Sequence, residues 1–385
     1  MTRNEKGQLL NASPVNFAMN DLDMKMGEGM SLQYVPSERA IEFLEDGGVQ
    51  FTVAAPTAKT VEIADTPQFI PGGSGKKYSL TKIDNARWQT VIYDLPAGFH
   101  YLFYSIDGVE QLYPLAPIGF GYGRAVNFVD IPDPEADFYE YRDVPRGTVR
   151  LETYPSQVCG YVRQCWVYTP PTYDTNPEKK YPVVYIQHGG GENEIGWFWQ
   201  GKAHWILDNL IAEGKCEEMI LVANAGYVNE IGVDASIFLP GDIAKLLRFD
   251  VIPFIEKRFR AIPDKAHRAM CGLSMGSCQT QYVGYNNPDL FAYLGVFSGS
   301  TKDMPRLDKY GIEKFLKREN AETLNAQYKL LFFSKGWEEG GKEQEEEIKQ
   351  LNDMGIKAEF FGCSGIHEWN VWRKALRCFV QKLFK

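Results

Sequence analysis

The sequence predicts an α/β domain built on a mostly parallel sheet and preceded by a smaller all-β sandwich domain. Two observations lead to this prediction. Between about residues 36 and 142, short segments that alternate apolar and polar residues are separated by glycine-containing turns, which is typical of β-strands. From about residue 145, short apolar strands alternate with amphipathic helices, which favours a parallel sheet with helices on its faces.

The bulk composition is that of a soluble globular protein of about two domains. The chain has 385 residues, of which 44% are hydrophobic and 24% are charged, as expected for a folded domain with a sizeable core. The formal net charge of −9 argues against nucleic acid as a partner. No apolar run reaches the length of a membrane span, so no membrane association is expected. The oligomeric state stays open.

Cysteine usage and the first residues bear on localisation. The seven cysteines are odd in number and show no zinc-site spacing, which favours a reducing compartment. The start "MTRNEKGQLLNASPVNF" is polar and lacks the apolar region of a signal peptide. We therefore expect a cytoplasmic protein, with a secreted protein that has lost its signal peptide as the alternative.

The all-β region falls within residues 36–142 and is predicted to be an immunoglobulin-like sandwich. In "GVQFTVAAP", Val49, Phe51 and Val53 share one face, and "KTVEIAD", "RWQTVIYDL", "FHYLFYSIDG" and "AVNFVDIP" follow as further strands. No helical period competes with this pattern. Residues 1–35, which are polar and rich in methionine, are predicted to form an N-terminal arm.

The α/β region covers residues 143–385. Its expected strands are "YPVVYIQH", "EMILVANA", "HRAMCGL", "YLGVFSGS", "YKLLFFS" and "IKAEFFG". Its expected helices are "AHWILDNLIAEG", "DIAKLLRFDVIPFIEKRF" despite Pro253, "MGSCQTQYVGYNN", "KEQEEEIKQLNDMG" and "EWNVWRKALRCFVQKLF". The Glu-rich run at 343–347 is interpreted as a solvated helix face.

A candidate nucleophile lies where one of these strands meets the following helix. The stretch "CGLSMGSCQT" contains Gly272-Leu273-Ser274-Met275-Gly276, which has the G-x-S-x-G spacing of the nucleophile elbow of an α/β-hydrolase. The two glycines permit a tight turn, and the N-terminus of the helix offers N–H groups to a developing oxyanion. The alternative is that Ser274 simply caps the helix.

A nucleophilic serine needs a base, and the chain contains five histidines. His100 lies in the sandwich, His204 lies within a helix, and His267 precedes the strand at its far end. His188 begins "HGGGENE", where an imidazole more often braces a loop. His367, in "GCSGIHEWN", follows the last strand, which is the position of the base in an α/β-hydrolase.

The acid is expected in the loop "KGWEEGG", after the strand "YKLLFFS". Glu338 and Glu339 are the only acids there before the helix, and either could orient the imidazole. The loop "QHGGGENE" could turn a backbone N–H toward the elbow, so Gly190 and Met275 are the candidate oxyanion donors. The loop lacks the G-K-[ST] sequence of a phosphate-binding loop.

Aromatic residues flank these candidates. Trp197 and Phe198 follow the glycine-rich loop, and Trp369 lies two residues after His367. Aromatic rings close to a reactive centre suit a flat or sugar-like substrate group, and packing in the core is the alternative reading.

The α/β region resembles carbohydrate esterase family one, which includes feruloyl (cinnamoyl) and acetylxylan esterases. The resemblance rests on "VYTPPTYD", "YPVVYIQHGGGENEIGW", "ILDNLIAEGK", "CGLSMGSCQTQYVGYNNPDLFAYLGVFSGS" and "HEWNVWRKAL". It implies Ser274 as nucleophile, His367 as base, and Gly190 and Met275 as oxyanion donors. It also favours Glu339 in "GWEE" as the acid, although the family more usually has aspartate there.

The first domain resembles the β-sandwich modules related to glycogen-binding domains, on "GVQFTVAAPTAKTVEIAD", "WQTVIYDLPAGFHYLFYSIDG" and "GRAVNFVDIP". Together the two resemblances imply a serine carboxylesterase that cleaves hydroxycinnamate esters of plant cell-wall sugars or small phenolic conjugates, without a metal or cofactor. The alternatives are an acetylxylan esterase, an enterochelin (catecholate siderophore) esterase, a peptidase, and a non-enzymatic glycan-binding protein on a hydrolase scaffold.

Overall fold

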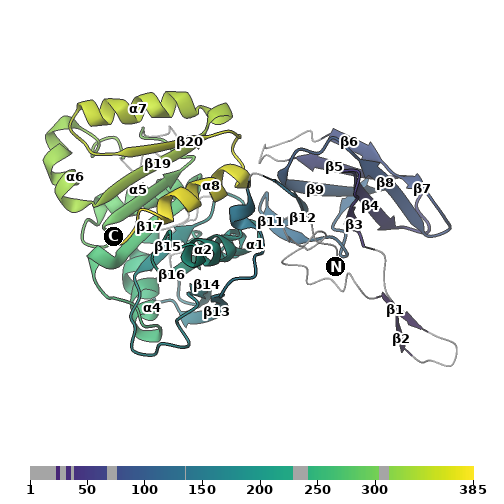
Figure 1. Ribbon diagram of the computed structural model, residues 1–385, viewed down its shortest axis with the longest axis horizontal. Coiled ribbons are helices and arrows are strands. Elements are labelled where there is room, and N and C mark those ends of the chain that lie inside the picture. Colours follow the sequence, from purple (N-terminus) through teal and green to yellow (C-terminus); the bar gives the residue numbers. More distant parts are fainter. Residues whose placement is uncertain are drawn as a thin grey trace. The chain divides into compact units, whose positions relative to one another are not determined.

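The structure, a computed structural model, describes residues 23–26, 32–35, 39–66, 76–134, 136–228, 242–302 and 312–385. It divides the chain into two compact units, Met1–Asp137 and Phe138–Lys385 (Figure 1). The N-terminal arm expected at 1–35 lies outside the described residues, apart from the antiparallel strands β1 (Asp23–Met26) and β2 (Leu32–Val35). The domain boundary expected after residue 142 stays a prediction.

The first unit contains two antiparallel sheets. One has the strand order β3-β4-β8-β7, and the other has the order β11-β12-β9-β5-β6, with β10 paired to β9. The strands are β3 (Ile41–Phe43), β4 (Val49–Ala54), β5 (Val61–Thr66), β6 (Lys76–Ser79), β7 (Thr81–Lys82), β8 (Arg87–Ile92), β9 (Gly98–Ile106), β10 (Val109–Gln111), β11 (Ile118–Gly121) and β12 (Arg124–Ile131).

The two sheets share one apolar core, which makes this unit a sandwich. Phe51 and Val53 of β4 are buried in the same cluster as Ile63 of β5 and Leu102 of β9. Alternate residues of a strand point to opposite faces, so the period of two in the sequence places these side chains inward. The predicted all-β sandwich is therefore confirmed.

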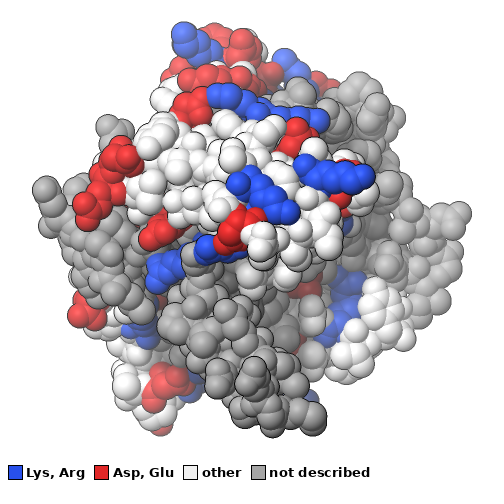
Figure 2. Space-filling model, turned by 90° about the vertical axis from the view of Figure 1, so that its right-hand side faces the viewer, with Lys and Arg blue, Asp and Glu red and all other residues white. Residues whose placement is uncertain are grey.

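Charged side chains of both signs are mixed on one face of the molecule. Figure 2 shows Lys and Arg interspersed with Asp and Glu over the described part of the face that it draws. Ion pairs also occur between charged side chains, such as Arg87 and Asp84, whose atoms lie 2.5 Å apart. A mixed surface of this kind is typical of proteins that stay soluble without a strong single-sign field.

The second unit is built on one eight-stranded sheet of order β13-β14-β16-β15-β17-β18-β19-β20. Strand β14 pairs antiparallel with both β13 and β16, and the strands from β16 to β20 run parallel. The strands are β13 (Thr148–Pro155), β14 (Val162–Thr169), β15 (Val183–Gln187), β16 (Ile220–Asn224), β17 (Arg268–Leu273), β18 (Tyr293–Phe297), β19 (Leu330–Gly336) and β20 (Glu359–Cys363).

Helices connect the parallel strands and cover the sheet (Figure 1). Apolar side chains of α3, α4, α5, α6 and α7 share one core cluster with the sheet, whereas α8 packs against α2 and against β18 to β20. This is the predicted α/β-hydrolase arrangement. The helices are α1 (Gly196–Trp199), α2 (Ala203–Ala212), α3 (Ile243–Leu246), α4 (Ile252–Arg258), α5 (Met275–Asn286), α6 (Ala321–Gln327), α7 (Gly341–Asp353) and α8 (Trp369–Val380), with short 3-10 turns at Asp137–Tyr139, Lys265–His267, Arg318–Asn320 and Trp337–Glu339.

The helical segment that contains Pro253 forms as expected, with one irregular turn. Helix α3 begins after Asp242, whose carboxylate accepts hydrogen bonds from the N–H groups of Ala244 and Lys245 at 2.9 and 3.3 Å. A π-helical turn, Leu247–Val251, then joins α3 to α4. Proline lacks an N–H and its ring collides with the carbonyl four residues earlier in a regular helix. Here the π-helical turn ends just before α4, which has Pro253 in its first turn.

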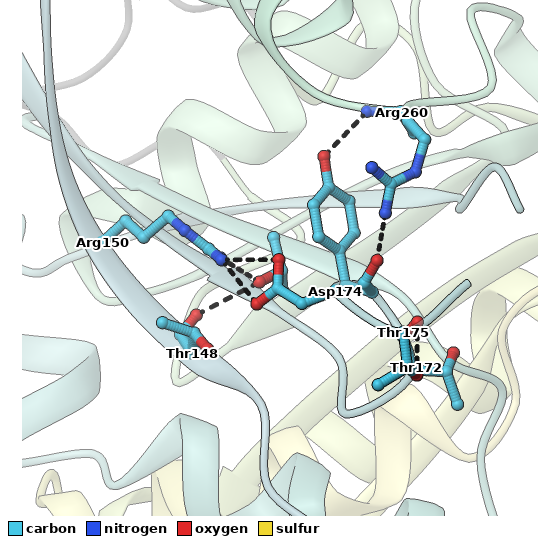
Figure 3. Close-up of polar contacts among 8 residues, drawn as sticks. Thr148, Arg150, Thr172, Asp174, Thr175 and Arg260 are labelled. Atoms are coloured by element: carbon cyan, nitrogen blue, oxygen red, sulfur yellow. Dashed lines mark hydrogen bonds and ion pairs between the residues drawn. The ribbon is translucent and has the colours of Figure 1, made fainter. Parts of the chain in front are cut away.

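The segment that leads into β15 is tied to the edge of the sheet by two arginines (Figure 3). The Arg150 guanidinium on β13 donates to both carboxylate oxygens of Asp174 at 3.1 and 2.9 Å. The Arg260 guanidinium lies 3.8 Å from the ring centroid of Tyr173. Separately, the backbone N–H of Arg260 donates to the Tyr173 hydroxyl at 3.1 Å. Planar guanidinium groups suit both kinds of contact, and together they fix the approach to the central strands.

Two further findings concern the whole described chain. Within the described residues, no helix is both long enough and apolar enough to cross a membrane. All seven cysteines are present as free thiols.

Candidate active site

Ser274 occupies a strained turn between β17 and α5. Its backbone has φ 51° and ψ −115°, a region that residues other than glycine rarely adopt. The Ser274 N–H donates to the Phe297 carbonyl of the neighbouring strand β18 at 2.9 Å, which holds the turn in place. Strain of this kind, kept by the surrounding structure, is typical of a nucleophile elbow.

Close approach of the backbone explains both glycines of the motif. A Cβ atom on Gly272 would lie 2.6 Å from the Gly276 carbonyl oxygen. A Cβ atom on Gly276 would lie 2.7 Å from the carbonyl oxygens of Gln187 and His188. Because backbone atoms cannot move aside cheaply, only glycine lets α5 pack this closely on β17 and on the end of β15.

We expect Gly276→Ala to lower the free energy of unfolding by about 2 kcal/mol, because the added methyl group overpacks two backbone carbonyls. Gly284→Ala is the matched control on the same helix, since its Cβ would meet mainly the flexible end of the Leu294 side chain. The gain in helix propensity offsets that contact, so the control should change stability by less than about 1 kcal/mol. Urea unfolding of both variants checks this, and equal losses would contradict the backbone explanation.

The side chain of Ser274 is not used to cap the helix. Ser274 stands at the N-cap position of α5, yet its hydroxyl makes no capping hydrogen bond, and the residue is half-buried. The Ser277 hydroxyl instead donates to the Ser274 carbonyl at 2.5 Å. The alternative reading of Ser274 as a capping serine is therefore wrong, and its hydroxyl is left for another role.

The structure brings His367 and Glu339 into direct contact. Glu339 ends the 3-10 turn after β19, and His367 lies between β20 and α8. The Nδ1 atom of His367 is 2.8 Å from Oε2 of Glu339, and the Glu339 side chain is only 8% exposed. Because a carboxylate only accepts hydrogen bonds, the proton of the neutral imidazole lies on Nδ1 and Nε2 keeps a free lone pair.

Glu338 makes a different contact. Its Oε2 accepts a hydrogen bond from the Gly365 N–H at 2.6 Å, in the turn that precedes His367. Gly365 has φ +128°, a conformation that glycine adopts readily. The sequence left open which of the two acids contacts His367. Glu339 lies against the imidazole, and Glu338 binds the backbone of Gly365, two residues before His367.

Two residues that the sequence analysis did not single out complete this arrangement. The Ser298 hydroxyl, directly after β18, donates to Oε1 of Glu339 at 2.5 Å and accepts from the Trp372 indole N–H at 2.9 Å. The Trp372 ring stands perpendicular to the His367 ring, with centroids 5.1 Å apart. These four side chains support one another in a closed ring. The signal in the sequence was a serine directly after a parallel strand, in "VFSGS".

The electrostatic balance at Glu339 favours its ionised form. Burial by itself raises the pKa of Glu339, but hydrogen bonds from His367, Ser298 and the Gly336 N–H, together with the charge of protonated His367, bring the pKa below its usual value. Hydrogen bonds that a carboxylate accepts stabilise its charged state. At neutral pH this residue is therefore a carboxylate.

This lowered pKa predicts a pH dependence of stability. A carboxylate with a folded-state pKa below its unfolded value stabilises the fold above the unfolded pKa, and the stabilisation is lost as pH falls through the folded pKa. We therefore expect the stability advantage of the wild type over Glu339→Gln to be constant at neutral pH and to shrink below about pH 4.5. Urea unfolding at a series of pH values measures it, and a difference independent of pH would contradict the assignment.

The glycine-rich loop lies beside the elbow. A Cβ atom on Gly189 would lie 2.5 Å from Leu273 Cδ1 and 3.5 Å from Ser274 Cβ, whereas a Cβ atom on Gly190 would meet nothing within 4 Å. Gly190 therefore borders open space next to Ser274. The Met275 N–H is in the first turn of α5, where N–H groups have no partner within the helix.

Ser274 and His367 come from the same edge of the sheet. Both residues follow the carboxyl ends of parallel strands, as does Glu339. Among the described residues, no hydrogen bond joins the Ser274 hydroxyl to the His367 imidazole. Such bonds are often long in an unliganded enzyme and shorten when substrate is bound.

The aromatic residues expected to contact substrate are in the interior instead. Trp197 is 0% exposed, Phe198 1% and Trp369 1%. The Trp197 indole N–H donates to the Gln187 carbonyl at 2.9 Å, and its ring packs edge-on against Trp369 at 5.2 Å. Side chains with so little exposed surface form the core beneath the site, which corrects the expectation of direct contact.

The other four histidines are engaged elsewhere. His100 pairs with Asp65 in the first unit, and His267 pairs with Asp264 on the surface. Burial lowers the pKa of His204 to about 3. His188 braces the glycine-rich loop, where its Nδ1 lies 2.8 Å from the Gly189 carbonyl oxygen. His367 therefore stays the predicted base for Ser274.

Comparison with known proteins finds one family model and several similar proteins. Residues 156–329 match the family model described as Esterase. An endo-1,4-beta-xylanase/feruloyl esterase of Xylanibacter ruminicola is 34% identical over 353 residues, which are 88% of this chain. An endo-1,4-beta-xylanase Y of Acetivibrio thermocellus is 32% identical over 191 residues, which are 47% of this chain. The chain spans 45% of the first relative and 16% of the second.

Solved structures share the fold. A ferulic acid esterase has a TM-score of 0.53 and 25% identity, and the match covers 61% of this chain and 97% of that one. The enterobactin esterase of Shigella flexneri has a TM-score of 0.56 at 15% identity and covers 89% of this chain and 94% of that one, a likeness of fold alone. The family match covers residues 156–329, so this part of the chain is similar to the Esterase family.

Proposed function

We propose that this protein is a serine carboxylesterase that forms an acyl-enzyme on Ser274. The observation that carries the proposal is the contact of 2.8 Å between His367 Nδ1 and Glu339 Oε2. The same edge of the sheet carries Ser274, in a strained turn and with a hydroxyl that makes no capping hydrogen bond. A nucleophile, a base and an orienting acid in this strand order are the parts that acyl transfer needs.

In the proposed mechanism, the Ser274 hydroxyl oxygen attacks the ester carbonyl carbon, and Nε2 of His367 takes its proton. The Glu339 carboxylate stabilises the imidazolium, while the N–H groups of Gly190 and Met275 receive the oxyanion. The bond to the alcohol oxygen then breaks as His367 returns the proton to the leaving alcohol. Water repeats the sequence on the acyl-enzyme and releases the acid and free Ser274.

The proposed substrates are hydroxycinnamate esters, of the ferulate or caffeate type, on plant cell-wall sugars or small phenolic conjugates. The relative from Xylanibacter ruminicola carries feruloyl esterase in its name, and it is similar over both units of this chain. A ferulic acid esterase is among the similar structures. Neither metal nor cofactor takes part in the proposed steps.

A hydrolysis panel on the purified protein tests this proposal: methyl ferulate, methyl caffeate, acetylated xylan and a catecholate triester. We expect release of ferulate or caffeate to be fastest. Release of acetate alone, or cleavage of the triester alone, would keep the ester hydrolase and reject the hydroxycinnamate substrate. If none of the four esters is cleaved, the enzyme proposal is rejected in favour of a glycan-binding protein on a hydrolase scaffold.

A further inference from the structure

The loop that carries Gly190 has its neighbouring N–H groups satisfied by side chains. The Gly189 N–H donates to Glu192 Oε2 at 2.9 Å, and the Gly191 N–H donates to the Tyr227 hydroxyl oxygen at 2.5 Å. Between them, the Gly190 N–H has no hydrogen-bond partner among the described residues. One donor of three consecutive glycines is thus left for a ligand, in a position that borders open space.

The orientation of that donor is set through the peptide to which it belongs. The Gly189 carbonyl and the Gly190 N–H belong to the same planar trans peptide, so they point in opposite directions. The Gly189 carbonyl oxygen lies 2.8 Å from Nδ1 of His188, and Nε2 of His188 accepts from the Gly226 N–H at 2.9 Å. Burial lowers the pKa of His188, which keeps the ring neutral, with one nitrogen as donor and the other as acceptor.

Tyr227 contacts the glycine-rich loop at two residues, His188 and Gly191. The centroid of its ring lies 5.3 Å from that of the His188 ring, and its hydroxyl oxygen accepts a hydrogen bond from the Gly191 N–H. The Tyr227 backbone is itself anchored, because the Arg163 guanidinium donates to the Tyr227 carbonyl at 2.9 Å and to the Ala225 carbonyl at 2.8 Å. Tyr227 therefore holds the Gly190–Gly191 peptide directly, and it packs against the His188 ring that contacts the Gly189 carbonyl.

On this geometry, and resting on the proposed esterase activity, we propose that Tyr227 is a positioning residue that orients the Gly190 N–H toward the oxyanion. It acts on the transition state and not on the bound ester, because the oxyanion exists only after Ser274 has attacked. An interaction made only in the transition state changes kcat and leaves KM nearly unchanged.

The test is Tyr227→Phe, which removes one oxygen atom and keeps the ring against His188. We expect kcat for methyl ferulate to fall by about 10- to 100-fold with KM within about 2-fold, since outright loss of an oxyanion donor costs about 10²- to 10³-fold. The inhibition constant of 2,2,2-trifluoroacetophenone, to whose carbonyl the Ser274 oxygen adds to form a tetrahedral oxyanion, should rise by the same factor as kcat falls.

Tyr161→Phe is the matched control. The Tyr161 hydroxyl accepts from the same arginine, Arg163, at 3.2 Å. Among the described residues, no hydrogen bond joins it to the glycine-rich loop, so we expect wild-type kinetics within about 2-fold. Thermal unfolding of both variants checks that they are folded.

Unchanged kcat and inhibition constant in Tyr227→Phe, or a rise in KM alone, would overturn the positioning role. In either case an active wild type would leave the esterase proposal standing. A wild-type protein that neither hydrolyses methyl ferulate nor binds the ketone would instead reject both proposals.

Discussion

Replacing Ser274 with alanine is expected to abolish ester hydrolysis, with a fall in kcat for methyl ferulate of about 10⁵- to 10⁶-fold. The hydroxyl oxygen is the atom that bonds to the acyl carbon, and no neighbouring group replaces it. The half-buried Ser274 side chain makes no capping hydrogen bond, so its removal should leave the fold intact. Stopped-flow release of product and mass spectrometry of the quenched protein measure the rate and the acyl adduct.

Ser300→Ala is the control for this substitution. Ser300 follows the neighbouring strand, and its hydroxyl accepts a hydrogen bond from the Lys302 N–H at 3.1 Å. Among the described residues, no hydrogen bond joins its side chain to His367 or Glu339. We expect this variant to keep wild-type rates and to form the acyl adduct. Full activity in Ser274→Ala, or an adduct on another residue, would show that the elbow is only a turn.

The second large effect is expected from Glu339→Gln, which should lower kcat by about 10⁴-fold. Glutamine has nearly the shape of glutamate, but its neutral amide no longer stabilises the imidazolium. If its NH₂ group faces Nδ1 of His367, the imidazole is also held in the wrong tautomer. The buried carboxylate with three hydrogen-bond donors around it is therefore replaced by a group of the same size without its charge. Steady-state kinetics on methyl ferulate measure the loss.

Glu338→Gln is the matched control, because it removes a negative charge from the adjacent residue, which does not contact the His367 imidazole. The two acids are adjacent, but Glu338 accepts from the Gly365 N–H and is exposed, and a glutamine oxygen can accept the same bond. We expect its kcat to stay within a few-fold of the wild type. If Glu338→Gln and Glu339→Gln lost activity equally, the contact between Glu339 and His367 would not be the reason for either loss.

Much of the fold and part of the site followed from local pattern. The period of two placed Phe51 and Val53 in the sandwich core, and the alternation of strands and helices indicated the parallel sheet. Ser274 and His367 could be located because chain order fixes which strand each residue follows, and parallel strands end at one edge. Their catalytic roles remain predictions that the substitutions above test.

The sequence by itself determined the layers of the fold and the edge of the sheet at which reactive groups gather, because these depend on periodicity and strand order. Only the tertiary structure decided which side chains meet there. It placed Glu339 and not Glu338 against His367, because successive residues of a short turn point in different directions. It joined Ser298, far away in the chain, to Glu339, and it buried Trp197 in the core. Contacts between distant segments depend on packing in three dimensions, which no local pattern records.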